Sequence, residues 1–244
     1  MSSRQPNVVN PEMTDTAEPS LILFSGLAAD ESIFLRQKSE FPSLIVPDWI
    51  TPLRNESLSE YCERFAQTLR PTGRCIIGGA SFGGIVAMEI ARYLDPLCVV
   101  LIGSVKGPAQ LPSRVRVFRP MRGIVSLIPI RALQWMCGAV EVASRWMPNV
   151  ASIVRQFRKA DPVLVRWSVR QVLSWQLAPE VECPVYHIHG DRDFVLPVSR
   201  TNPDTIVRSG HVLTMTHPVE VNAFLRECLN RFRPDSPLPG PECD

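Results

Sequence analysis

The sequence predicts an α/β fold: a mostly parallel central sheet of about six strands with helices on both faces and one inserted helical cap. Short apolar runs rich in β-branched residues alternate with stretches of helical spacing, which is typical of a parallel sheet. One long segment, 105–178, lacks strand-like runs altogether. A chain of 244 residues with 45% hydrophobic content can bury the core that such a domain needs. We therefore expect one domain, built from 20–104 and 179–233, with the cap at 105–178.

The N-terminal half of the core begins after a polar, proline-containing lead-in. Residues 1–19 are expected to be flexible, and the apolar run 21–24 to be the first buried strand. The loop 25–30 leaves the carboxyl end of that strand, where open α/β sheets build their sites. Residues 44–46 form a second short strand. Ser57, followed by Glu60, predicts a capping box and a helix to about Leu69.

Residues 75–84 carry the strongest signal in the chain. A β-branched run ends in glycines, presents one serine, and continues with helical spacing to Leu94. Gly79-Ala80-Ser81-Phe82-Gly83 fits the G-x-S-x-G pattern of a strained strand-to-helix turn that exposes a serine nucleophile. The N–H of Phe82, at the helix start, is a candidate donor to an oxyanion. A phosphate loop is the competing interpretation, but the Gly-Lys-Ser/Thr ending is missing.

The segment 105–178 follows another strand at 97–102 and has an unusual charge. It holds 12 Lys and Arg residues against two acidic residues, whereas the rest of the chain is acidic, and the whole has a net charge of only +2. A basic cap favours an acidic carrier protein, an anionic acyl group or a membrane surface as partner, or it is simply a solvated arginine-rich face. No nucleic-acid-binding motif accompanies the charge, so nucleic acid is not expected. The four cap tryptophans, most often core residues in such a setting, are Trp135, Trp146, Trp167 and Trp175.

The C-terminal half supplies a carboxylate and an imidazole at the same end of the predicted sheet. Strands are expected at 184–189 and 204–207. Asp193 follows the first of them, and His211 lies on the loop after the second. With Ser81 they stand in the chain order Ser, Asp, His. A final helix runs to about residue 232, and the proline-rich tail 234–244 is expected to be loose.

Several residues compete for these roles. Asp191 is an alternative acid, and His217 an alternative base, although a position before Pro218 at a helix start suits capping or packing. His187 and His189 point to one face of a strand and with Asp191 might suggest a metal, but buried, hydrogen-bonded strand histidines are more common. Glu89, on the helix after Ser81, is interpreted as a surface charge.

From the composition we expect a cytoplasmic protein without a transmembrane segment. No run of about 18 apolar residues is present, and the N-terminus is polar where a signal peptide would be apolar. Cysteines occur at seven scattered positions with no C-x-x-C pair, so we expect buried thiols: Cys62, Cys75, Cys98, Cys137, Cys183, Cys228 and Cys243.

Three motifs together resemble the α/β-hydrolase superfamily: the elbow 79–83, the acid turn 189–193, and Gly210-His211 followed by 216–218. The resemblance covers roughly 20–233 and is to serine esterases with a small helical cap. The basic cap is similar in placement to the lid of small carboxylesterases, including the family that cleaves methyl esters on acyl carrier protein. It implies a Ser81-Asp193-His211 triad, an oxyanion hole made by the N–H groups of Leu27 and Phe82, and no metal or organic cofactor. The family's usual His-Gly pair before this hole is Ser25-Gly26 here.

The leading functional hypothesis is therefore a serine hydrolase of a carboxylic ester or thioester, acting on an apolar or anionic acyl group through an acyl-enzyme. An acyltransferase would use the same triad with an alcohol in place of water. A non-catalytic ligand- or carrier-binding protein of the same fold is a third hypothesis, and a cofactor-free haloperoxidase-like activity would share these residues.

Overall fold

A computed structural model describes residues 18–69, 71, 73–176 and 180–233. Five strands form one sheet in the order β1-β2-β3-β4-β5, and every neighbouring pair is parallel. The strands are β1 (Ser20–Phe24), β2 (Cys75–Ala80), β3 (Cys98–Ile102), β4 (Val185–Gly190) and β5 (Thr205–Val207). Because all strands run the same way, their carboxyl ends share one edge of the sheet.

The sixth predicted strand, 44–46, is not formed as a strand. Only Ile45 bridges to Ile22 of β1, with its N–H donating to the Leu21 carbonyl and its carbonyl accepting from the Leu23 N–H, both at 2.9 Å. Pro42 and Pro47 lie close on either side, and a proline cannot donate to a strand ladder. The segment therefore has room for one bridge and no more.

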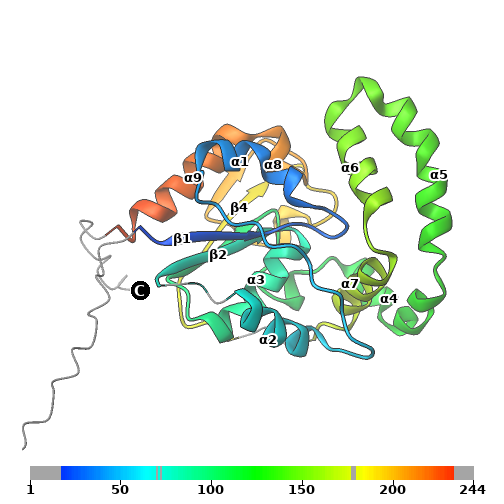
Figure 1. The fold of residues 1–244 in the computed structure, drawn as a ribbon, viewed down its shortest axis with the longest axis horizontal. Coiled ribbons are helices and arrows are strands. Elements are labelled where there is room, and N and C mark those ends of the chain that lie inside the picture. Colours follow the sequence, from blue (N-terminus) through cyan, green and yellow to red (C-terminus); the bar gives the residue numbers. More distant parts are fainter. Residues whose placement is uncertain (1–17, 70, 72, 177–179, 234–244) are drawn as a thin grey trace, which may run out of the picture.

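Helices cover both faces of the sheet, as predicted. On one face lie α1 (Leu35–Glu40), α8 (Leu213–Thr216) and α9 (Pro218–Asn230), and on the other α2 (Leu58–Leu69) and α3 (Phe82–Leu94) (Figure 1). Alternate residues of β1 serve the two layers: Ile22 and Phe24 join the core beneath α2 and α3, whereas Leu21 and Leu23 join the core beneath α9. This alternation is the period of two expected of a strand buried on both faces.

The predicted capping box begins α2. The Ser57 N–H donates to Glu60 Oε2 at 2.8 Å, and the Glu60 N–H donates back to Ser57 Oγ at 3.3 Å. These reciprocal bonds satisfy two N–H groups that have no partner within the helix.

The chain between β3 and β4 contains helices and, among its described residues, no strand. They are η2 (Pro108–Gln110), α4 (Ser113–Phe118), η3 (Arg119–Leu127), α5 (Ile130–Ala143), η4 (Ser144–Trp146), α6 (Pro148–Lys159) and α7 (Pro162–Ser174). In Figure 1, α5 and α6 stand side by side beyond the carboxyl edge of the sheet, with α5 outermost, and α4 and α7 lie at their foot. The sequence-based expectations for residues 1–17 and 234–244 lie outside the described part of the chain.

Candidate active site

Ser81 lies at the sharp turn where β2 ends and α3 begins. Its backbone has φ 53° and ψ −119°, a conformation that is strained for a residue with a side chain. Two hydrogen bonds hold it there: the Ser81 N–H donates to the Ile102 carbonyl at 3.1 Å, and Ser104 Oγ donates to the Ser81 carbonyl at 2.7 Å. The turn is therefore fixed to β3 and to the residues that follow it.

The glycines of this turn are required by space. A Cβ on Gly79 would lie 2.4 Å from the carbonyl carbon of Gly83, and a Cβ on Gly83 would lie 2.2 Å from the carbonyl oxygen of Phe24. Contacts this short with backbone cannot be relieved by moving a side chain. The G-x-S-x-G spacing thus reflects the close crossing of α3 over β1 and β2.

The structure brings Ser81, His211 and Asp193 into one hydrogen-bonded row. His211 Nε2 lies 2.9 Å from Ser81 Oγ, and His211 Nδ1 lies 2.7 Å from Asp193 Oδ2. The three residues follow β2, β4 and β5, whose carboxyl ends lie at one edge of the sheet because all its strands are parallel. Of the two candidate acids, Asp191 is exposed, and Asp193 is the one that contacts the imidazole.

The carboxylate of Asp193 is buried and fully bonded. Oδ1 accepts the N–H groups of Val195 and Leu196, both at 2.8 Å, while Oδ2 faces His211 and, at 3.3 Å, Nε2 of His189. Burial alone would raise the pKa of Asp193, but the hydrogen bonds from His189, His211 and the Leu196 N–H hold it well below its usual value. The group is an anion at neutral pH and aligns the imidazole.

His187 and His189 form a buried chain behind this carboxylate. His189 Nε2 lies 2.7 Å from the Leu196 carbonyl, so this nitrogen carries the proton, and Nδ1 accepts from His187 Nε2 at 2.9 Å. Burial, and to a smaller extent Coulombic interactions with His189 and Lys106, lower the pKa of His187 to about 3, so the His187 ring is neutral at physiological pH. The two strand histidines are therefore hydrogen-bonded within the core. Among the described residues, no group of three or more His, Cys, Asp or Glu side chains is arranged to bind a metal ion.

The loop after β1 lies directly beside Ser81. A Cβ on Gly26 would be 3.8 Å from the Ser81 Cβ, and Leu27 and Phe82 both line the same cavity as Ser81. Ser25, which replaces the family's usual histidine, donates from Oγ to the Ala29 carbonyl at 2.9 Å and accepts from Trp49 Nε1 at 2.8 Å. These bonds pin the loop, a role of Ser25 and Trp49 that the sequence did not reveal.

A cavity of about 620 Å³ opens in front of Ser81 and His211, between core and cap. Its walls are predominantly apolar, and the cap contributes Leu111, Val115, Cys137, Ile153, Phe157 and Val172. At its rim Arg114 donates to the Phe194 carbonyl at 2.7 Å. A site of this size and polarity suits the hydrocarbon part of a small ligand.

Gln156 connects the cap to the loop beside the serine, and no sequence pattern marked it. Its buried side chain accepts the Asp30 N–H at 3.1 Å through Oε1 and lines the cavity. An amide on an arginine-rich helix has many possible partners, so only the folded structure selects this one.

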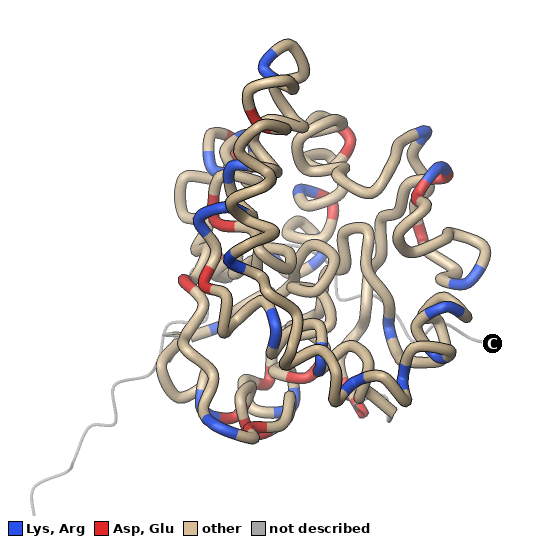
Figure 2. The backbone as a smooth tube through the Cα atoms, turned by 90° about the vertical axis from the view of Figure 1, so that its right-hand side faces the viewer, with Lys and Arg blue, Asp and Glu red and all other residues tan. Residues whose placement is uncertain are grey.

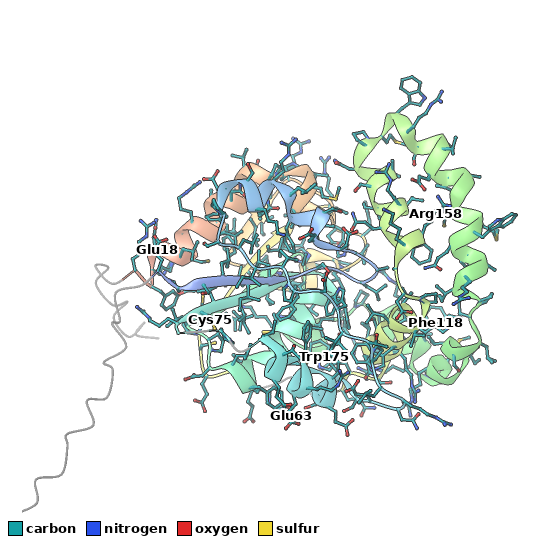
Figure 3. The ribbon with its side chains drawn as sticks, viewed as in Figure 1. Glu18, Glu63, Cys75, Phe118, Arg158 and Trp175 are labelled. Atoms are coloured by element: carbon teal, nitrogen blue, oxygen red, sulfur yellow. The ribbon has the colours of Figure 1, made fainter. Side chains whose placement is uncertain are left out.

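The sequence-based interpretation of Glu89 as a surface charge is wrong. Its side chain is 5% exposed, and its Oε1 accepts the Trp175 Nε1–H at 2.7 Å, with Arg92 3.9 Å away (Figure 3 labels Trp175). Burial raises the pKa of Glu89 despite these two partners. The end of the cap covers this part of α3, which the sequence alone does not show.

Further expectations met different outcomes. His217 is the N-cap residue of α9, but its side chain makes no capping hydrogen bond; its Nδ1 lies 2.9 Å from Thr216 Oγ1 instead. Of the four cap tryptophans, Trp167 and Trp175 are buried, but Trp135 and Trp146 are each 81% exposed, so the expectation of core packing is wrong for these two. The described cysteines are all free thiols, four buried and two half-buried, and Cys243 lies outside the described residues.

The parallel sheet with a serine at a strained turn and an imidazole and carboxylate aligned behind it defines a hydrolase-type α/β protein. This chain belongs to the alpha/beta hydrolase family, whose model matches residues 21–224. No curated protein matches the sequence at a significant level.

Solved structures with the same fold are distant in sequence. The chain is similar to a thermophilic esterase from Thermogutta terrifontis, with 19% identity, a TM-score of 0.69, and 89% of this chain and 91% of that one covered. It is similar to the enol-lactonase from Burkholderia xenovorans LB400, with 17% identity, a TM-score of 0.69, and 87% and 92% covered. It also resembles the RedJ thioesterase of prodiginine biosynthesis in Streptomyces coelicolor, with 15% identity, a TM-score of 0.52, and 85% and 83% covered.

Proposed function

We propose that this protein is a serine hydrolase that cleaves a carboxylic ester or thioester through an acyl-enzyme intermediate. The observation that carries the proposal is the row of 2.9 Å and 2.7 Å contacts from Ser81 Oγ through His211 to Asp193, at the edge of an apolar cavity. The esterase, lactonase and thioesterase among the structural neighbours support the same class of acyl chemistry.

Acylation begins when His211 Nε2 takes the proton of Ser81 Oγ and the oxygen attacks the substrate's carbonyl carbon. The new C–O bond pushes the carbonyl electron pair onto oxygen, and the N–H groups of Leu27 and Phe82 stabilise this oxyanion. Collapse of the tetrahedral intermediate expels the alcohol or thiol, which takes the proton from His211. Asp193 keeps the proton of His211 on Nδ1 and stabilises the transient imidazolium.

Deacylation repeats these steps with water. His211 removes a proton from the water, the hydroxide attacks the acyl carbon, and Ser81 Oγ leaves with the proton returned by His211. The acid product then departs from the cavity. An alcohol in place of water would give the acyltransferase outcome from the same residues.

The cavity favours an acyl group that is largely hydrocarbon. The cavity lining includes Leu27, Ile85 and Val154. The hydrocarbon chain of an ester bound at Ser81 would contact these side chains. The substrate class is thus an apolar acyl ester or thioester, with Arg114 at the rim as the nearest cation for an anionic group.

The proposal is tested by labelling the full-length protein with a fluorophosphonate and locating the adduct by peptide mass spectrometry. Modification of Ser81, lost in Ser81→Ala, supports it. Turnover is measured on p-nitrophenyl esters of increasing chain length and on acyl thioesters, with and without a competing alcohol.

Two histidine variants sharpen the test. His211→Ala should abolish both labelling and turnover, whereas His217→Ala, whose ring bonds only Thr216 among the described residues, should retain them. A folded protein that is neither labelled nor active on any ester or thioester overturns the proposal.

A further inference from the structure

The half of α5 turned away from α6 carries two stripes of apolar side chains, which nothing covers within the described chain. Leu133, Trp135, Met136, Val140 and Val142 are all exposed, and Trp135 is 81% exposed. The opposite side of α5 packs on α6, with Gln134 buried between them and donating to the carbonyls of Phe157 on α6 and of Ala160 just after it. Soluble helices normally place their polar side chains outward, so the exposed apolar side chains of α5 depart from the usual pattern.

Exposed apolar residues continue on the elements before and after α5. We call this surface the outer cap face; it comprises the exposed residues of α5, the exposed cations Arg116, Arg122 and Arg145, and the exposed apolar residues Val117, Phe118, Met121, Ile124, Leu127, Trp146 and Met147. Figure 3 labels Phe118 in the cap, beyond the sheet. Exposed large apolar side chains are far more frequent in 117–147 than a soluble surface requires, which makes this part of the cap a candidate interaction surface.

Cations are interleaved with these apolar side chains. Arg116, Arg122, Arg131 and Arg145 are exposed, and none forms an ion pair with a carboxylate within the described residues. The Arg145 guanidinium lies 5.0 Å over the Trp146 ring. Figure 2, viewed from the cap side, shows basic positions spread along the cap with few acidic ones between them.

The acidic exception does not neutralise this face. Glu141 accepts hydrogen bonds from Arg155 Nε at 3.0 Å and from Arg158, both on α6. Its charge is already satisfied by two cations, and these pairs tie α5 to α6. The exposed arginines of the outer cap face therefore keep their positive charge unpaired.

The chemistry of this face decides among possible occupants. A second copy would place arginines against arginines, and an acidic carrier protein would satisfy the cations but would have to bury two indoles and many aliphatic side chains as well. An anionic lipid surface satisfies both, because indoles lie at the headgroup level, aliphatic side chains reach the acyl boundary, and arginines meet the phosphates. We propose that the outer cap face docks onto an anionic lipid surface.

Docking of this kind is peripheral. The 14 residues of α5 span about 21 Å, shorter than a hydrocarbon core of about 30 Å. No single helix of the described chain has the length and apolar character to cross a membrane; Ser113–Leu127 and Ile130–Trp146 meet that standard only when joined, and they are bent by 93°. The helix lies in the plane of the interface.

One consequence joins this surface to the proposed function. Cys137, on α5, lines the cavity in front of Ser81, while Trp135 and Met136 point outward from the same helix. The lipid surface and the cavity are then separated by one helix, roughly 10–12 Å across. An apolar acyl ester dissolved in the membrane would then lie about one helix diameter from the cavity.

Binding is tested with the full-length Ser81→Ala protein, so that lipid hydrolysis cannot interfere and a failed catalytic proposal does not affect the result. Flotation is measured with phosphatidylcholine vesicles and with vesicles that also contain phosphatidylglycerol, at low and moderate salt. We expect binding to the mixed vesicles, weakened by salt because screening shortens the attraction.

Variants separate the two contributions. Trp135→Ser with Trp146→Ser should lower the partition coefficient by at least about tenfold, and Arg122→Gln with Arg131→Gln by on the order of fivefold for each charge removed. Ile206→Ser with Val219→Ser is the matched control, since these side chains are 59% and 76% exposed but lie outside the cap. This control pair should bind as the parent does.

The proposal is overturned if the folded protein does not float with mixed vesicles, if replacing both tryptophans leaves flotation unchanged, or if the control variant reduces flotation equally. Two other results would assign the outer cap face to another occupant and so overturn the proposal. One is saturable binding of an acidic carrier protein without vesicle binding; the other is dimerisation that is lost when both tryptophans are replaced.

Discussion

Replacing Asp193 by Asn tests whether this carboxylate sets the tautomer of His211. The amide oxygen of Asn can still accept the N–H groups of Val195 and Leu196, which are bound at 2.8 Å. The amide NH₂ then replaces Oδ2 and faces two ring nitrogens that carry protons, on His211 at 2.7 Å and His189 at 3.3 Å. The Asn NH₂ group and the Nδ1–H of His211 are both donors, so the tautomer of His211 with its proton on Nε2 is favoured.

With its proton on Nε2, His211 cannot accept the proton of Ser81. We expect kcat to fall by about 10⁴-fold, or about 5 kcal/mol of transition-state stabilisation, with little change in KM. Loss of two charge-assisted hydrogen bonds should also cost about 3–5 kcal/mol of unfolding free energy. The assay is steady-state hydrolysis of a p-nitrophenyl ester, normalised to the folded fraction from circular dichroism.

The stability loss depends on pH in a defined direction. The native pKa of Asp193 is lowered by its hydrogen bonds, so the carboxylate stabilises the fold above its unfolded pKa of about 3.9, and this contribution is lost as pH falls through the native value. The difference in unfolding free energy between the parent and Asp193→Asn should be full at neutral pH and shrink in acid below about pH 4.

Asp191→Asn is the matched control for this experiment. Asp191 lies two residues away, carries the same side chain and is exposed. Its replacement should leave kcat within about twofold of the parent, as for surface substitutions generally. A folded Asp193→Asn protein with kcat within tenfold of the parent, or an equal loss in the Asp191 variant, would refute the reasoning.

Two further predictions concern stability. Gly83→Ala places a Cβ 2.2 Å from the Phe24 carbonyl oxygen and should lower the unfolding free energy by more than about 3 kcal/mol or prevent folding. Gly123→Ala, where a Cβ would meet open space, should change the unfolding free energy by less than about 1 kcal/mol in urea titrations. Equal effects of the two variants would contradict the close crossing of α3 over β1. Glu89→Gln keeps an acceptor for Trp175 and removes a buried charge whose pKa is raised. A carboxyl with a raised native pKa stabilises the fold in acid, and this stabilisation is lost as the pH rises through the native pKa. Glu89→Gln should therefore have a higher Tm than the parent at pH 8, and the same Tm as the parent below about pH 4. A lower Tm than the parent at pH 8 would contradict this.

Most of the fold and the central site residues were accessible from sequence because their signals are local. A serine between closely spaced glycines requires a particular backbone, and a serine followed three residues later by a glutamate caps a helix through atoms that are neighbours in the chain. Apolar runs of β-branched residues fix parallel strands, and parallel strands fix which loops meet at one edge. Ser81, Asp193 and His211 could therefore be named before their distances were known.

The sequence alone determined the α/β class, the order of the elements and the three residues at the sheet edge. Only the tertiary structure decided which side chains are buried and what they contact. Two cap tryptophans are buried and two are exposed, Trp175 covers Glu89, and His189 lies next to Asp193. The burial of a side chain depends on which distant segment packs on its helix, and the residue type does not encode that. Neighbouring residues determine the local backbone conformation, whereas the burial of a side chain and its contact partners are determined only when the helices and strands pack together.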